Sequence, residues 1–259
     1  MSLNIAANLT MMFNEHDFMD RFATAAHCGF KGVEYLFPYD YPADTIGEQL
    51  EANGLKQVLF DFPAGDWSAG DRGIAVQPDR VGEFQDGVGL AVEYAEVLGC
   101  ERLTCLAGIP DDGVDPEIAE ETMIQNLRFA ADVAARIGAI VLVEPLNTRD
   151  VPGTYVSKSA HGARLVQAAD RANVRLQFDV YHTQIMEGDL ALKFTEFLPL
   201  IGHVQIADNP GRHEPGSGEI NYPFVLDHIA NSGYDGWIGA EYIPACDTES
   251  GLGWVKSYL

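Results

Sequence analysis

Four side chains with oxygen donors stand where four successive apolar segments of the sequence end. They are Glu144 in "IVLVEPLN", Asp179 in "VRLQFDVYH", Gln205 in "IGHVQIAD" and Glu241 in "WIGAEYIP". Three converging carboxylates cannot all stay ionised without a counter-ion, because like charges raise one another's pKa. No lysine or arginine lies at these segment ends. An all-oxygen set suits a hard divalent cation, so we expect these four residues to bind Mg2+ or Mn2+ rather than zinc.

The segment around Glu144 illustrates why such an acid needs a partner. Four aliphatic residues precede it, a run that is typical of a strand buried on both faces. Because side chains alternate along a strand, Glu144 is expected to share the inner face with Ile140 and Leu142. A buried carboxylate without a partner is costly. One inward acid alone is compatible with a structural role, but four donors on successive strands favour a functional site.

The apolar segments recur along the whole chain, with stretches of helical periodicity between them. We expect strands at 3–9, 32–36, 55–62, 102–108, 140–147, 174–182, 201–208 and 237–244. Helical stretches such as 79–99 and 116–138 each close on a glycine, as helices often do. Eight strand–helix units in 259 residues predict a (β/α)8 TIM barrel. No linker-like tract divides the chain, so residues 1–259 are expected to form a single domain.

A doubly wound open sheet is the competing architecture. Its dinucleotide-binding fingerprint is missing, because the first strand runs into "NLTMMF" with no G-x-G-x-x-G pattern. The barrel also makes a sharper prediction, since its chemistry should lie at the C-terminal ends of the strands. The four oxygen donors stand at those ends.

Alternation along the later strands predicts which of their side chains face the barrel axis. Asp179 alternates with apolar residues in the sixth segment, and His203 and Gln205 do so in the seventh. His203 is expected to lie deeper than Gln205 and to support the metal site. Gly239 shares a face with Glu241 and should leave space beside that carboxylate.

Composition restricts the class of partner. With 16 basic and 39 acidic residues the net charge is −23, which repels a phosphate backbone or an anionic membrane surface. We therefore expect no nucleic-acid or membrane partner. No segment approaches the roughly 18 to 20 apolar residues of a membrane span. The N-terminus lacks the features of a secretory signal, so a cytoplasmic location is expected. The sequence leaves open whether the protein forms a homo-oligomer through an outer helix.

The chain contains four cysteines, at positions 28, 100, 105 and 246. They form no CxxC pair and are too few to cross-link a chain of this length. We interpret them as reduced thiols in the core, because free cysteine is among the most buried residue types.

Several segments resemble the hydroxypyruvate isomerase family, within the xylose-isomerase-like barrels. They are "ANLTMMF", "GVEYLFPYDY", "FPAGDWSAGDRGIA", "VEPLN", "FDVYH", "IGHVQIADNPGRHEPGSGEINY" and "GWIGAEY". The ordered set runs along essentially the whole chain and is highly specific. The resemblance implies that Glu144 and Glu241 are metal ligands and also the acid/base pair. It implies that Asp179 and Gln205 complete the metal site.

The implied reaction moves a carbonyl between adjacent carbons. Hydroxypyruvate, HOCH2-CO-COO−, would interconvert with tartronate semialdehyde, OHC-CH(OH)-COO−. A metal that holds the ketone and hydroxyl oxygens acidifies the C3 proton by stabilising an enediolate. One glutamate would then remove that proton while the other manages protonation at the neighbouring carbon or oxygen. A hydride shift on the same scaffold is the open alternative.

A small anionic hydroxy-oxo acid needs a donor for its carboxylate. Arg212, in a glycine-containing loop after the seventh strand, is the first candidate, Arg72 the second and Lys158 the third. His182, three residues after Asp179, is expected to touch a substrate oxygen. Solvated or structural roles are the alternatives for each of these side chains. The aromatic residues that follow the first three strands are candidate pocket walls: Phe13, Tyr39 and Trp67.

Four other functions compete with this interpretation. A 2-oxo-tetronate isomerase would use the same metal set and differ only in pocket length. A ketose 3-epimerase typically has histidine where this chain has Gln205. An abasic-site endonuclease uses several zinc ions and many histidines, whereas this chain has seven histidines and a charge of −23. A non-enzymatic binding barrel is disfavoured because all four candidate ligands are present.

Overall fold

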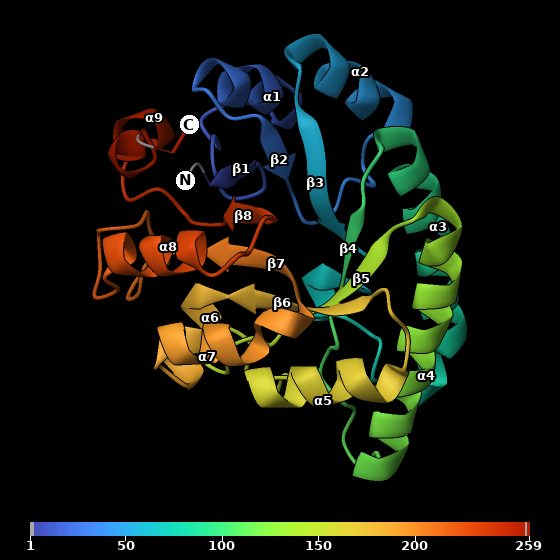
Figure 1. Cartoon of the computed structure of the whole chain (residues 1–259). Helices are drawn as coiled ribbons and strands as arrows, with labels where there is room; N and C mark the ends of the chain where they lie inside the picture. Colours follow the sequence, from blue (N-terminus) through green and yellow to red (C-terminus); the bar gives the residue numbers. More distant parts are fainter. Residues whose placement is uncertain (1–2, 257) are drawn as a thin grey trace.

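Eight parallel strands close into a barrel in the computed structural model, which describes residues 3–256 and 258–259 (Figure 1). Each strand pairs with its neighbours in sequence, and β8 pairs with β1. The strands are β1 (Asn4–Asn8), β2 (Gly32–Glu34), β3 (Lys56–Asp61), β4 (Arg102–Cys105), β5 (Ile140–Val143), β6 (Val174–Asp179), β7 (Ile201–Ile206) and β8 (Trp237–Ala240). The prediction of a (β/α)8 barrel is confirmed.

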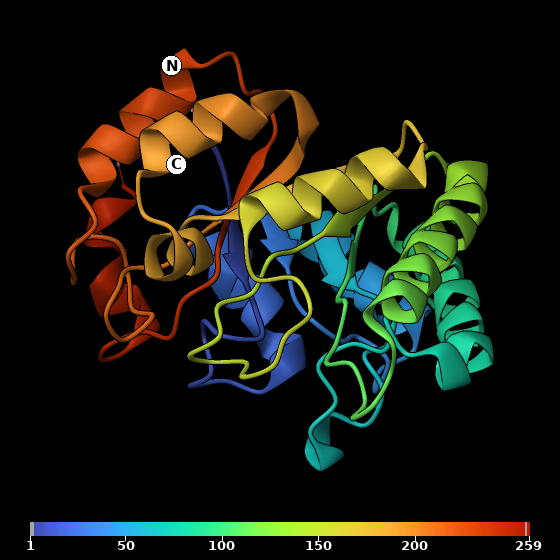
Figure 2. The same cartoon turned by 90° about the horizontal axis from the view of Figure 1, so that it is seen from below.

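Helices surround the barrel on the outside, as Figures 1 and 2 show from two directions. The α-helices are α1 (Phe18–His27), α2 (Ala43–Asn53), α3 (Val81–Leu98), α4 (Pro116–Ala134), α5 (Ser159–Ala169), α6 (Val180–Met186), α7 (Leu190–Phe197), α8 (Tyr222–Asn231) and α9 (Thr248–Gly251). Short 3-10 turns are η1 (Trp67–Ala69), η2 (Pro78–Arg80), η3 (Ala135–Ile137), η4 (Leu198–Leu200) and η5 (Leu252–Trp254). No helix in the described ranges is long and apolar enough to cross a membrane.

The longest helix, α4, shows how local sequence sets the bounds of an element. The side chain of Asp115 accepts a hydrogen bond from the amide of Glu117, and Pro116 occupies the first turn, where no amide donor is needed. The helix tightens into η3 and ends at Gly138, whose positive φ of 73° stops it. The predicted helical stretch at 116–138 is therefore confirmed, with its last turn in 3-10 form.

The strands are shorter at their C-terminal ends than the sequence predicted. The fifth segment was expected to stay extended to residue 147, but β5 ends at Val143 and Pro145 follows closely, without an amide donor for the ladder. The sixth was expected to reach residue 182, but β6 ends at Asp179, which caps α6 instead. The polar residues at these ends leave the sheet and form the rim of the barrel.

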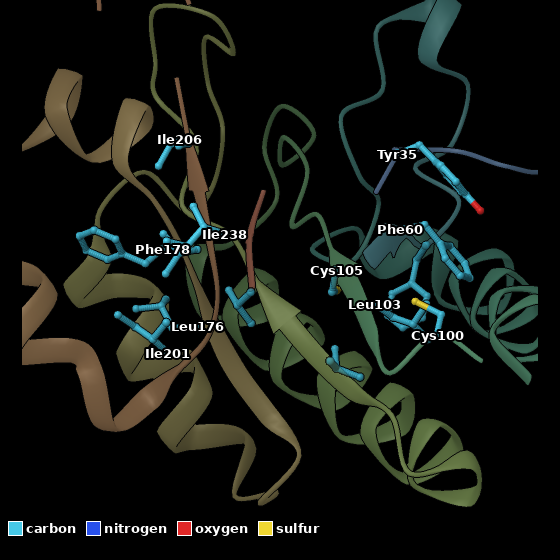
Figure 3. Packing of buried hydrophobic residues seen from close by; sticks show 14 of the residues in the cluster. Tyr35, Phe60, Cys100, Leu103, Cys105, Leu176, Phe178, Ile201, Ile206 and Ile238 are labelled. Carbon is cyan, nitrogen blue, oxygen red and sulfur yellow. The ribbon is translucent and has the colours of Figure 1, made fainter. Parts of the chain in front are cut away.

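The main hydrophobic core lies between the outer face of the strands and the helices. Figure 3 shows Leu176 and Phe178 of β6 on one side of the barrel and Leu103 and Cys105 of β4 on the other. Phe178 packs edge-on against Phe194 of α7, with ring centroids 5.6 Å apart. Each such buried side chain contributes roughly 1.5–3 kcal/mol through removal from water. This outer core fixes the strands that carry the site.

The interior of the barrel is apolar at the N-terminal end. Ala6, Val58 and Leu142 are buried there, with Ile140 and Trp237 packed against them. These side chains close the floor, as layers of apolar residues do in such barrels. The interior therefore opens only toward the C-terminal ends of the strands.

All four cysteines are free. Cys100 and Cys105 are buried, which agrees with the prediction of core thiols, and Cys28 is half-buried. The prediction was wrong for Cys246, which is exposed in the segment after β8.

Candidate active site

A small cavity of about 180 Å3 lies at the C-terminal mouth of the barrel. Drug-sized ligands occupy pockets of roughly 300 to 1,000 Å3, so this cavity suits a smaller molecule. Its lining residues come from the ends of most strands: Met11, Leu36, Asp61, Trp67, Arg72, Leu106, Glu144, Leu146, Asp150, Val151, Gln177, His182, Arg212 and Glu241. The predicted acid/base pair and both predicted substrate-binding residues thus share one cavity.

Glu144 follows β5 and carries a carboxylate oxygen without a partner. Its Oε1 is buried and accepts no hydrogen bond from any described residue. Burial raises the pKa of Glu144 well above its usual value, and the nearby charges of Glu241 and Asp179 raise it further. An unpaired buried carboxylate needs a cation or a proton, so this oxygen is a candidate ligand for a metal ion.

Asp179 ends β6 and is held by the helix that follows. Its Oδ1 accepts the backbone amide of His182 at 3.0 Å, as an N-cap of α6. One ligand atom from each of Glu144, Asp179 and His182 lies within 4.8 Å of the others. Two of the four predicted metal ligands are therefore brought together, and the cluster has the composition to hold a metal ion.

The ring of His182 is fixed in one tautomer by Asn147. The backbone amide of Asn147 donates to Nδ1 of His182 at 3.1 Å, and the side-chain amide of Asn147 lies 2.7 Å from the same nitrogen. Nδ1 is thus an acceptor and Nε2 carries the proton of the neutral ring. Burial lowers the pKa of His182 to about 4, so the ring stays neutral. In this tautomer the ring presents the Nε2–H group to the cavity as a hydrogen-bond donor.

Asn147 is itself held in place by the turn that follows it. Its Oδ1 accepts the backbone amides of Arg149 at 3.0 Å and Asp150 at 2.8 Å, which fixes the direction of its amide group. The signal that could have revealed its role is its place three residues after Glu144, where the chain must turn back over the rim.

Glu241 is paired with Arg212, a contact that the sequence did not reveal. Nη2 of Arg212 donates to Oε2 of Glu241, while Nδ2 of Asn8 donates to Oε1 at 3.3 Å. Burial raises the pKa of Glu241 to about 8, even though Arg212 opposes the shift. No lysine or arginine stands at the ends of these strands, but the loop after β7 brings Arg212 to Glu241. Arg212 has a positive φ of 56° and lies over the ring of Tyr181, which directs its side chain back into the barrel mouth.

Two glycines near Arg212 shape the loop that carries it. The amides of Gly216 and Gly218 donate to Oδ2 of Asp208 at 2.8 and 2.9 Å. A Cβ on Gly218 would lie 2.3 Å from the carbonyl oxygen of Asn209. These two glycines therefore fold the loop around the Asp208 carboxylate.

A buried network of hydrogen bonds fixes the side chain of Gln205. Its Oε1 accepts from Nε2 of Gln177 at 2.6 Å, and its Nε2 donates to Oε1 of Glu34 at 2.9 Å. Nε2 of His203 lies 2.8 Å from Oε2 of the same glutamate. His203 is therefore deeper than Gln205, as predicted. Oε1 of Gln205 retains a second lone pair, and its role as a metal ligand stays a prediction.

Two buried acids at the ends of β2 and β3 were not predicted from the sequence. Glu34 of β2 is fully buried and fills the space that Gly239 leaves, since a Cβ there would lie 2.2 Å from Oε1 of Glu34. Asp61 ends β3 and lines the cavity, and burial raises its pKa well above the usual value. Each is the last residue of its strand, the same signal that revealed Glu144.

The remaining predicted contacts divide into those at the cavity and those away from it. Trp67 and Arg72 line it, with the guanidinium carbon of Arg72 4.0 Å from the ring centroid of Trp67. Phe13 is buried in the core against Phe30, so the prediction that it walls the pocket was wrong. Tyr39 donates to the backbone carbonyl of Asp61 from outside the cavity lining. Lys158 is exposed on the rim.

Comparison with known proteins places this geometry in a family. The model of the xylose isomerase-like TIM barrel family matches residues 22–258. The chain belongs to this family. A 2-oxo-tetronate isomerase from Cupriavidus necator is 48% identical, and the match covers 98% of both chains. The hydroxypyruvate isomerase of Escherichia coli K12 is 45% identical, with 99% of both chains covered. This xylose isomerase-like barrel is an isomerase, as those relatives are.

Solved structures agree with the fold. A crystal structure titled AP endonuclease, family 2, from Brucella melitensis superimposes with a TM-score of 0.97 at 48% identity, covering 100% of this chain and 99% of that one. A D-allulose 3-epimerase from Methylomonas sp. superimposes with a TM-score of 0.80 at 19% identity, covering 100% of this chain and 98% of that one. The second likeness shows the fold alone.

Proposed function

We propose that this xylose isomerase-like barrel interconverts hydroxypyruvate and tartronate semialdehyde. The observation that carries the proposal is the small cavity of about 180 Å3, in which two buried glutamates and the Nε2–H donor of His182 converge. A three-carbon acid fits this volume, and the reaction needs an acid/base pair and a donor for an oxygen that gains charge. The 45% identical hydroxypyruvate isomerase supports the same reaction.

The donor set fits a divalent ion, which we propose to be Mg2+ or Mn2+. Glu144, Asp179, Gln205 and Glu241 would hold it, and the unpaired Oε1 of Glu144 supports this assignment. All four donors are oxygen atoms, which favours these hard ions over zinc. When bound, the ion polarises the substrate carbonyl and hydroxyl oxygens.

The proton transfers are assigned to the two glutamates. Glu144, with a free carboxylate oxygen at the cavity, removes the proton from the hydroxyl-bearing carbon. Glu241, fixed by Arg212 and Asn8, returns a proton at the neighbouring position. His182 donates from Nε2 to a substrate oxygen. Arg212 binds a second oxygen through Nε, a buried donor with no partner among the described residues.

A 2-oxo-tetronate is the second candidate substrate. The relative from Cupriavidus necator, 48% identical, carries that activity in its name. Both substrates share the 2-oxo-carboxylate end, and the four-carbon acid adds one hydroxymethyl group at the other end. A ketose 3-epimerase has less support, because Gln205 replaces the histidine typical of that activity and the epimerase structures share only the fold.

We propose that neither nucleic acid nor a membrane is a partner. The relative titled AP endonuclease does not alter this, since a charge of −23 repels DNA. The cavity volume is also suited to a small metabolite rather than to a nucleotide in a duplex. A cytoplasmic location and assembly into a homo-oligomer stay expectations.

Proton NMR of the reaction in D2O tests the function. Protein loaded with Mg2+ or Mn2+ is incubated with hydroxypyruvate, with Glu144→Gln and EDTA-treated protein as controls. Tartronate semialdehyde should form only with the intact loaded protein, and deuterium on the receiving carbon favours proton transfer over a hydride shift. Turnover of a 2-oxo-tetronate but not of hydroxypyruvate would replace the first candidate by the second.

A further inference from the structure

Two arginines enter the cavity from opposite sides of the barrel. Arg72 lies in the loop after β3, and Arg212 lies in the loop after β7. In a closed barrel of eight strands ordered by sequence, β3 and β7 face each other across the axis. A small substrate in the cavity therefore has a guanidinium on each side, and the two guanidinium groups have different surroundings.

Arg212 lies among the acids. Its Nη2 pairs with Glu241, and a second carboxylate, that of Asp150, lies 4.0 Å from its Nη1. The charge of Arg212 is thus already shared by two acids of the protein, and a substrate carboxylate bound there would compete with them. A neutral hydroxyl or carbonyl oxygen needs no such charge. The β7 side of the cavity thus favours the uncharged end of the substrate.

One side of the Arg72 guanidinium is held by the protein, and its other side is available to bind a ligand. Its Nη1 donates to the backbone carbonyls of Trp67 at 3.1 Å and Asp71 at 2.7 Å, and its guanidinium stacks on the Trp67 ring. Its Nε and Nη2 bond to no protein group in the part of the chain that the structure describes. These two nitrogens form the parallel donor pair that grips a carboxylate. Holding Nη1 in place reduces the ordering cost of that grip.

The acids on this side do not compete for Arg72. The side chain of Asp71 is bound by Arg80 at 2.8 Å and by the backbone amide of Asp66 at 2.7 Å. Asp61, which lines the cavity on this side, is buried, and burial raises its pKa well above its usual value, which favours the neutral carboxyl group. A neutral carboxyl group donates a hydrogen bond to an anion rather than repelling it.

We propose that Arg72 binds the carboxylate of the substrate through Nε and Nη2 and thereby selects 2-oxo acids over neutral sugars. The proposal rests on the proposed function and names the part of the site that recognises the acid. It applies equally to the three-carbon and four-carbon candidates, because both carry the carboxylate next to the 2-oxo group. The uncharged end of the substrate is then directed toward the glutamates.

Binding of glycerate, a three-carbon acid without an oxo group, tests the proposal independently of turnover. Calorimetry compares the wild type with Arg72→Met, Arg72→Lys and, as a charge-matched control on the exposed rim, Lys158→Met. Loss of a charge-assisted pair should weaken binding about 10- to 100-fold in Arg72→Met. Arg72→Lys should recover part of this, because it keeps the charge but not the fork. Lys158→Met should bind as the wild type does.

Kinetics with whichever acid is turned over provides a second readout. A carboxylate bound equally in the ground and transition states sets KM, so Arg72→Met should raise KM about 10- to 100-fold and change kcat less than about threefold. A structural defect would instead lower kcat and the affinity for Mn2+. Unchanged glycerate binding in Arg72→Met, with the loss appearing in Arg212→Met, overturns the proposal. Arg72-dependent glycerate binding without turnover of either acid keeps it and refutes the proposed function.

Discussion

The two halves of the barrel rim carry similar residue types but differ in how those residues are paired. In the half formed by β5 to β8, Glu144 keeps a buried carboxylate oxygen that has no partner within residues 3–256 and 258–259. In the half formed by β1 to β4, both oxygens of Glu34 are used, by Asn8, Gln205 and His203. The first arrangement needs something added from outside, whereas the second is complete.

This difference distinguishes a reacting acid from a supporting one more clearly than burial does. Both glutamates end or follow a strand and both are buried, so their position and exposure do not separate them. A satisfied carboxylate rigidifies its neighbours, and an unsatisfied one retains the free energy to bind an ion or a proton. Variants should therefore test whether each carboxylate oxygen has a hydrogen-bond partner in the protein.

The largest expected effect is on the reacting half. Glu144→Gln removes the proposed base at nearly constant shape and should lower kcat/KM by about 100- to 10,000-fold. Asp61→Asn is the matched change on the other half, and we expect it to cost less than about tenfold, since burial raises the pKa of that carboxyl group and favours its neutral form. Steady-state rates with hydroxypyruvate measure both. Equal losses of kcat/KM in the two variants would contradict the proposal that the two halves of the rim have different roles.

A second effect concerns His182 and pH. The pKa of this ring is about 4 in the folded protein and 6.5 when unfolded, so the unfolded chain takes up the proton first as pH falls. The free energy of unfolding should therefore decrease between pH 6.5 and pH 4, by about 3 kcal/mol from this group. Urea unfolding of EDTA-treated protein across this range gives the slope, and His182→Gln should flatten it. Parallel curves for the two proteins would contradict the assignment.

The smallest effect is expected in the supporting half. Glu34→Gln keeps the shape of the side chain but replaces an acceptor oxygen by a donor that faces Gln205 or His203. Loss of such support beneath a metal site weakens metal affinity by about 10- to 100-fold. Titration with Mn2+ measures it, and kcat at saturating Mn2+ should stay within about tenfold of the wild type. A loss of kcat as large as that of Glu144→Gln would make Glu34 a reacting group.

The fold could be predicted from the sequence because its signals are local. Runs such as the one before Glu144, and the glycines that stop α3 and α4, depend on residues close in the chain. The sequence predicted that the strands end several residues later than they do. The reason is that polar residues continue the alternating pattern beyond the last strand hydrogen bonds. Asp179 is the last residue of β6 and its side chain caps α6, so the chain turns into a helix where the alternation predicted that the strand would continue.

Residues of the site could be predicted only where the sequence of a single strand indicated them. Glu144 and Asp179 were found because each ends its own apolar segment. The pair of Arg212 and Glu241 joins residues 29 positions apart, and the contact of His203 with Glu34 joins residues 169 apart. No pattern in a single sequence specifies which distant loop or strand delivers a partner. These contacts depend on closure of the barrel.

The contact between Gly239 and Glu34 also limits how the sequence can change. The two residues flank β1 from opposite sides, and the carboxylate occupies the volume that a side chain at 239 would need. Neither position can gain or lose atoms alone without a clash or a hole. Substitutions at these sites are therefore expected to occur together in the lineage. Any redesign that grafts β8 into another barrel must transfer β2 with it.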